Sequence, residues 1–162
     1  MPTTRRGFIR MLGSAGVIAG ATPALGACDA VPDSATAAWQ GPAADIGLRR
    51  RLLSYALLAP NPHNMQPWLV DMREPDTITL YCDRDRLLPE TDPYGRQIMI
   101  GHGTFLELLD LAAAAHGLAT GITYFPEGDY PDDGIGDAPV ARVRLTADGG
   151  RPKDPLFDQI LY

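Results

Sequence analysis

Ten residues, from Ala59 to Trp68, contain three prolines and three carboxamide side chains, and they constrain the fold more than any other segment. Proline has no amide hydrogen and restricts the residue before it, so Pro60 and Pro62 must end any helix that reaches them. Apolar residues at helical spacing precede these prolines, and Asp45 is a suitable N-cap. The sequence therefore predicts a helix from Asp45 through Leu58, followed by a stiff loop and then a strand.

The rest of the chain combines strand patterns with one long helical pattern. Four segments have the composition of strands: residues 68–72, 77–82, 119–125 and 139–145. Turn-forming residues from Arg73 to Asp76 predict a hairpin between the first two strands. A second helix is predicted from Tyr94 or Gly95 to His116, with Gly117 as its C-cap. This order predicts the α+β class, with a mostly antiparallel central sheet flanked by helices.

Charge is distributed unevenly along the chain. Residues 1–27 include Arg5, Arg6 and Arg10 and no acidic residue. The other 135 residues hold 11 basic and 20 acidic side chains, a net charge of -9. A nucleic-acid surface needs clustered lysines and arginines that displace counterions from phosphate. We therefore expect no nucleic-acid partner for the acidic body.

The basic N-terminus is typical of an export signal. Arg5 and Arg6 are followed by Phe8 and by a weakly apolar, glycine-rich run that is too short to span a membrane. This pattern resembles a twin-arginine signal peptide covering residues 1–27, whose pathway carries folded proteins to the periplasm or another extracytoplasmic space. The alternative is an ordinary secretory signal that happens to contain two adjacent arginines.

Cys28 follows Leu25-Gly26-Ala27, a sequence that resembles a lipobox. A lipidated Cys28 would anchor the exported protein to a membrane, because more than one acyl chain gives stable attachment. The alternative is cleavage near residues 19–21, which leaves Cys28 as a free thiol. Residues 28–44 are small, contain proline and suit a tether.

The carboxamides of the Ala59–Trp68 segment allow two interpretations. An Asn or Gln amide presents a donor and an acceptor, which suits the edge of a flat heteroaromatic ligand. Alternatively, the carboxamides hydrogen-bond the end of the helix and the start of the strand. The three histidines and Cys82 have no metal-ligand spacing, so we expect no metal site.

The run from Leu58 to Trp68, LAPNPHNMQPW, resembles the APSSHNTQPW signature of the nitroreductase superfamily, in particular its Acg-type branch of FMN-binding oxidoreductases. Weaker similarity continues through further segments of the chain: 81–89, 92–96, 100–103, 111–113, Gly117, 139–141 and 154–157. The resemblance implies FMN as the cofactor. It also implies NAD(P)H as the reductant and nitroaromatic or quinone-like acceptors as substrates.

The resemblance also implies which residues bind the flavin. Residues matching Pro60, Asn61 and Pro62 would line the isoalloxazine ring, and Asn64 would hydrogen-bond its polar edge. Two serines usually stand where this chain has Asn61 and Pro62, and Pro62 has no amide to offer the flavin. The family builds its site across two related halves, so a second nitroreductase-like half or a homodimer partner is expected. No catalytic acid or base is identified, because the flavin ring carries the reaction.

The segment from Pro155 to Tyr162 starts a helical pattern without a stop signal. We therefore expect a nitroreductase-like domain from residue 45 to residue 162 that is the N-terminal part of a longer protein. An arginine-rich stretch that binds the FMN phosphate follows this point in the family. Two other functions remain open: an exported protein that binds or sequesters flavin without turnover, and a lipoprotein interaction module without flavin.

Overall fold

A computed structural model describes residues 32–131 and 134–161 of the chain. The predicted export signal with Arg5 and Arg6, and the predicted lipidation site Cys28, lie outside the described residues. The chain divides after Ala37 into two units. In the first, α2 (Asp33–Thr36) is a single exposed turn. The second unit, from Ala38 onward, contains the sheet and the remaining helices.

The first α-helix of the larger unit, α3 (Leu48–Ala56), has its N-cap two residues later than predicted. Asp45 is not its N-cap, which corrects the sequence interpretation. Gly47 occupies the N-cap with an extended backbone, and its carbonyl accepts the first helical hydrogen bond from the amide of Arg51 (3.0 Å). Since Asp45 lies in an exposed turn, its carboxylate caps nothing. The helix ends at Ala56, before the prolines and two residues before the predicted end at Leu58.

The predicted hairpin is confirmed as β1 (Trp68–Asp71) and β2 (Thr77–Cys82), which pair antiparallel with Trp68 opposite Cys82. The two later strands, β3 (Leu118–Tyr124) and β4 (Ala141–Ala147), also pair antiparallel. The four strands form one sheet in the order β1-β2-β4-β3, because β4 returns to lie beside β2.

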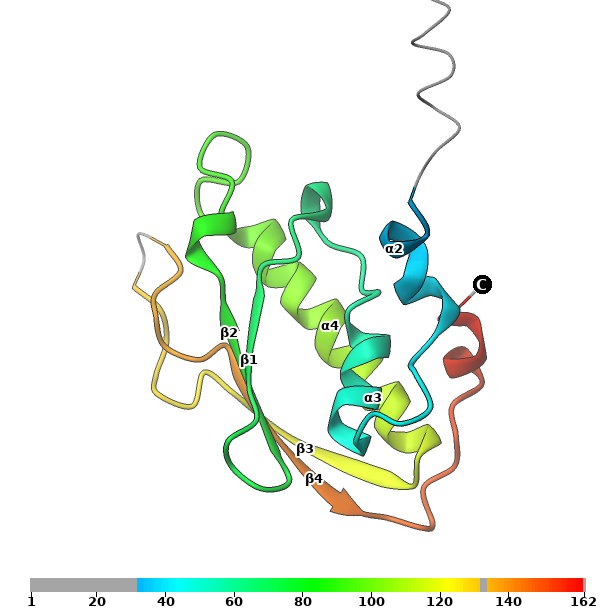
Figure 1. Cartoon of the computed structure of the whole chain (residues 1–162). Coiled ribbons are helices and arrows are strands. Elements are labelled where there is room, and N and C mark those ends of the chain that lie inside the picture. Colours follow the sequence, from blue (N-terminus) through cyan, green and yellow to red (C-terminus); the bar gives the residue numbers. More distant parts are fainter. Residues whose placement is uncertain (1–31, 132–133, 162) are drawn as a thin grey trace, which may run out of the picture. The chain divides into compact units, whose positions relative to one another are not determined.

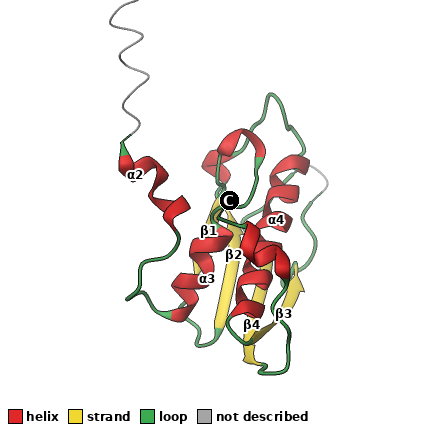
Figure 2. Cartoon of the chain, turned by 90° about the vertical axis from the view of Figure 1, so that its right-hand side faces the viewer, coloured by secondary structure: helices red, strands yellow, loops and turns green. Residues whose placement is uncertain are grey.

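The long helix α4 (Arg96–Ala115) lies with α3 on one face of this sheet (Figures 1 and 2). The two helices pack against each other and bury a shared core. Phe105 and Leu109 are fully buried at its centre, and burying such a side chain contributes about 1.5–3 kcal/mol. The opposite sheet face carries the exposed Arg142 and Arg144, which alternate with buried residues along β4. This one-sided burial is typical of an antiparallel sheet.

Among the described residues, α4 is long and apolar enough to cross a membrane by length and composition alone. More than half of that stretch is buried inside the fold, as in a core helix. After β4 the chain forms a short 3-10 helix, η4 (Pro155–Gln159), where the sequence predicted the start of a helix. The predicted α+β class is confirmed, and the open antiparallel sheet with its helices is compatible with part of a nitroreductase-like fold.

Candidate functional site

The segment that joins α3 to β1 holds every flavin-contact residue predicted from the sequence. We call residues 60–67 the carboxamide loop. Pro60 and Asn64 are exposed, and Asn61 and Pro62 are half-buried. Within the loop, Pro62–Asn64 form a single 3-10 turn. The structure therefore brings all four predicted residues together in one short stretch of surface.

The backbone of this loop is strained. His63, Asn64 and Gln66 have positive φ values of 50°, 52° and 48°, although none of them is glycine. The left-handed conformation costs a non-glycine residue about 1–3 kcal/mol, so the surrounding structure must hold it in place. Such strain tends to collect at ligand-binding sites. Three strained residues within four positions mark the loop as the most unusual backbone among the described residues.

Hydrogen bonds inside the loop hold this conformation. Both polar atoms of the Asn61 carboxamide have a partner: its Nδ2 donates to the Ala59 carbonyl (3.1 Å), and its Oδ1 accepts from the Gln66 amide (2.7 Å). Gln66 Nε2 in turn donates to Asn64 Oδ1 (3.2 Å). These bonds agree with the structural interpretation of the carboxamides for Asn61 and Gln66. Asn64 differs, because its Nδ2 has no partner among the described residues.

The far end of the loop is tied to the turn that follows β2. The guanidinium of Arg86 donates to the carbonyl of Met65 (2.9 Å) and to the carboxylate of Asp83 (3.1 Å). The Asp83 amide donates to the carbonyl of Pro67 (2.8 Å). These hydrogen bonds therefore attach the end of the loop to the residues that follow β2.

Trp68 and His102 are buried where β1 leaves the loop and packs on α4. Their rings meet edge to face with centroids 6.0 Å apart, and Trp68 also packs on Phe105 at 5.0 Å. Burial lowers the pKa of His102, and its Nδ1 lies 2.9 Å from the Ile98 carbonyl, so the neutral ring carries its hydrogen on Nδ1. Trp68 Nε1 and His102 Nε2 have no hydrogen-bond partner among the described residues.

This burial bears on which groups can take part in chemistry. His102 is fully buried, so its imidazole is closed to a ligand on the surface. Cys82 is also buried, and burial raises the pKa of its thiol to about 11. A thiol with that pKa is a poor nucleophile near neutral pH. His63 is the exposed imidazole of the carboxamide loop.

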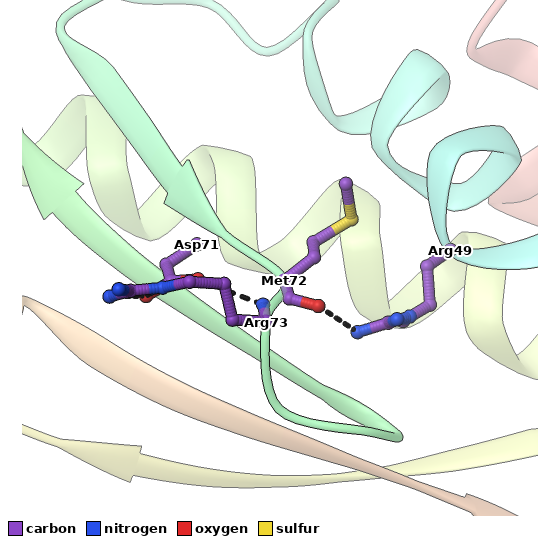
Figure 3. A network of polar contacts seen from close by, with 4 residues as sticks. All are labelled: Arg49, Asp71, Met72 and Arg73. Atoms are coloured by element: carbon purple, nitrogen blue, oxygen red, sulfur yellow. Dashed lines mark hydrogen bonds and ion pairs between the residues drawn. The ribbon is translucent and has the colours of Figure 1, made fainter.

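A second polar network lies at the opposite end of β1, where the hairpin turns (Figure 3). Arg49 Nη1 donates to the carbonyls of Met72 (2.9 Å), Glu74 (2.8 Å) and Thr77 (3.0 Å). Beside it, hydrogen bonds from Arg73 lower the pKa of Asp71 to about 2. The sequence did not predict this role of Arg49, because carbonyl acceptors leave no pattern in the sequence.

A cleft of about 950 Å³ opens near this network rather than at the carboxamide loop. Its lining combines apolar residues with the exposed Arg50 and Arg144. Arg49 also lines this cleft, and its Nη1 already donates to the hairpin carbonyls. Among the described residues, no three His, Cys, Asp or Glu side chains gather in a way that could hold a metal ion.

No family model matches the chain. Three proteins of Mycobacterium tuberculosis are similar to parts of it. One, with the provisional name NAD(P)H nitroreductase acg, is 38% identical over 76 residues, or 47% of this chain and 23% of the relative. Another with the same provisional function, Rv3131, is 32% identical over 122 residues, or 72% of this chain and 32% of the relative. The uncharacterized protein Rv3127 is 39% identical over 80 residues, or 48% of this chain and 23% of the relative.

The chain therefore spans 23 to 32% of the length of these relatives. Two of them carry names that describe an NAD(P)H-dependent nitroreductase. This partial similarity supports the resemblance to the nitroreductase superfamily that the Leu58–Trp68 run shows.

Proposed function

We propose that this chain is part of an FMN-dependent NAD(P)H oxidoreductase of the nitroreductase type, and that the carboxamide loop contacts the flavin. The observation that carries this proposal is the loop itself. It is strained at three non-glycine residues, it leaves the Nδ2 of Asn64 unpaired, and it lies in the run that resembles the family signature. The similarity to relatives named as NAD(P)H nitroreductases supports the same reaction class.

The residues of the loop fit a flat, polar-edged ring. Pro60 is exposed and Pro62 is half-buried, so their rings offer apolar surface to one face of such a ligand. The exposed Asn64 amide has donors left for the polar edge. Asn61 is different, because both polar atoms of its side chain are bonded inside the loop. We assign it to the lining of the site and not to a hydrogen bond with the ring.

When bound, FMN supplies hydride and electron transfer through its ring system. The chain's own residues bind and orient: Asn64 fixes the polar edge, while Pro60 and Pro62 exclude water from one face. The expected partners are NAD(P)H and a nitroaromatic or quinone-like acceptor. A second nitroreductase-like half or a homodimer partner completes the site in this proposal.

Replacing Asn64 by glycine tests the proposed contact. Glycine accepts the φ of 52° without strain, whereas alanine would add backbone strain of its own. We expect Asn64→Gly to weaken FMN binding by about 1–3 kcal/mol, which is typical of leaving a buried polar partner unpaired. FMN titration followed by flavin fluorescence measures the change.

The matched control is His63→Gly, at an exposed neighbour with nearly the same φ of 50°. This variant relieves the same kind of strain without touching the proposed contact, so it should bind FMN as the wild type does. Equal affinity of Asn64→Gly and wild type would reject Asn64 as a ligand. A colourless wild-type protein that releases no FMN on heating would reject the flavin function. Bound flavin that stays oxidised with excess NADH or NADPH and a nitroaromatic would favour sequestration without turnover.

We also propose that the protein is exported by the twin-arginine route and held at a membrane through lipidated Cys28. The motif at Arg5 and Arg6 supports this route, and cofactor loading in the cytoplasm would require export of a folded protein. Replacing both arginines by lysine should leave the precursor in the cytoplasm, as fractionation and immunoblotting would show. Normal export of that variant would contradict the twin-arginine route. The anchor is tested separately by Cys28→Ser, which should release the protein from membranes.

A further inference from the structure

The carboxamide loop lies against α4, and one residue of that helix leaves room for it. Gly101 is buried beneath the loop. A methyl group at Gly101 would lie 3.2 Å from Cβ of Asn61 and 3.4 Å from Cδ of Pro62. The contact with Asn61 is tighter than nearly all real Cβ contacts, so the loop would have to shift by a few tenths of an ångström, while the distance to Pro62 is close to ordinary packing. Gly101 therefore forms a notch in α4 that the Asn61–Pro62 pair occupies.

One turn further along α4, a hydroxyl holds the start of the loop. Thr104 Oγ1 lies 2.7 Å from the carbonyl of Pro60 and 2.8 Å from the carbonyl of Gly101. The single hydroxyl hydrogen therefore has a loop acceptor and a helix acceptor within reach. Residues three apart on a helix share a face, so Gly101 and Thr104 both contact the first residues of the carboxamide loop.

The helix that carries these two groups is itself rigidly placed. Phe105 of α4 is fully buried in the core and packs on Trp68, the first residue after the loop. The loop is thus fixed by α4 at its start and by Arg86 near its end. These two attachments explain how the left-handed residues between them persist without glycine.

We propose that Gly101 and Thr104 are positioning residues that set the carboxamide loop for flavin binding. This inference rests on the proposed function. Neither side chain is required to touch the flavin: Gly101 acts by leaving space and Thr104 by holding the Pro60 carbonyl. Because binding groups must be placed to within about half an ångström, a small displacement of the loop would move Asn64 away from its partner.

The chain supplies a matched control for the notch. Gly103 lies in the same helix, two residues away, and a methyl group there would meet no atom within 4 Å. Both Gly101→Ala and Gly103→Ala raise intrinsic helix propensity, so propensity cannot distinguish them. For the hydroxyl, Thr104→Val removes the donor while keeping the shape, and Thr104→Ser keeps the donor.

The experiment combines two measurements on the full chain. FMN titration gives the affinity, and hydrogen exchange of the flavin-free protein follows three loop amides that are hydrogen-bonded within the loop: Asn64, Met65 and Gln66. We expect Gly101→Ala and Thr104→Val to bind FMN about tenfold more weakly and to exchange these amides faster. Gly103→Ala should match the wild type in both measurements, and Thr104→Ser should restore affinity and protection.

The outcomes separate this inference from the function on which it rests. A wild type that binds no FMN overturns the proposed function and, with it, the proposed role of Gly101 and Thr104 in flavin positioning. A wild type that binds FMN, with Gly101→Ala binding as tightly as Gly103→Ala, overturns the positioning role alone. Faster exchange with unchanged FMN affinity also overturns it, because the loop would then be seated by α4 without consequence for the flavin.

Discussion

At the scale of single residues, His102 is the most buried titratable side chain in the part of the chain that the structure describes. It is fully buried, and that burial lowers its pKa. An unfolded chain exposes this imidazole and restores its ordinary pKa. As pH falls below about 6.5, the unfolded state binds a proton that the folded state does not accept. The contribution of His102 to stability is therefore present at neutral pH and is lost as pH falls from the ordinary pKa toward the lowered one.

The direction in which pH changes the contribution of His102 to stability can be measured directly. We expect NMR spectra to show that the His102 ring of the folded protein titrates at a lower pH than an exposed imidazole, and that it keeps its hydrogen on Nδ1. Comparison with His102→Gln assigns its signals. Urea unfolding should show that, as pH falls below the ordinary pKa of histidine, the wild type loses more free energy of unfolding than His102→Gln. A ring that titrates near its ordinary pKa would contradict the assignment.

At the scale of elements, Arg49 connects α3 to the β1–β2 hairpin. Its guanidinium donates hydrogen bonds to three carbonyls of the hairpin, from Met72 to Thr77, at 2.8–3.0 Å. Those carbonyls would otherwise need water, and a charged donor gives them stronger bonds than a neutral one. The contact also fixes the position of α3 relative to β1, the two elements between which the carboxamide loop is stretched.

We expect Arg49→Ala to lower the free energy of unfolding by about 1–2 kcal/mol, allowing for the partial exposure of the site. Arg50→Ala is the control, because Arg50 is exposed and donates no hydrogen bond among the described residues. Urea unfolding of both variants measures the difference. Equal stabilities would show that water replaces the arginine without cost.

At the scale of the whole molecule, most elements could be predicted because their patterns are local. The prolines after α3 set a limit that the helix does not pass, and a strand-like composition predicted β4. The start of α3 was missed because the N-cap of Gly47 depends on backbone geometry that several residues could adopt. Helix boundaries of this kind are set by tertiary context.

The candidate site could be predicted only in part, for the same physical reason. The resemblance identified the four loop residues, but nothing in the sequence marks His63 or Gln66 as left-handed, since neither is glycine. Both polar atoms of the Asn61 side chain have hydrogen-bond partners, whereas only the Oδ1 of Asn64 has one among the described residues. This difference depends on which atoms lie near each side chain. Likewise, the notch at Gly101 exists only because a distant segment packs there.

The packing of Trp68 gives the molecule an optical reporter. Its indole is buried against Phe105 and His102 with an unbonded Nε1, whereas the other tryptophan of the chain, Trp39, is 64% exposed. An indole in a dry, apolar setting emits at shorter wavelength than one in water, so the two residues contribute distinguishable fluorescence. With Trp39 replaced by phenylalanine, the remaining emission comes from the residue that directly follows the carboxamide loop. Energy transfer from that indole to a yellow ligand would then report occupancy of the loop without any added dye.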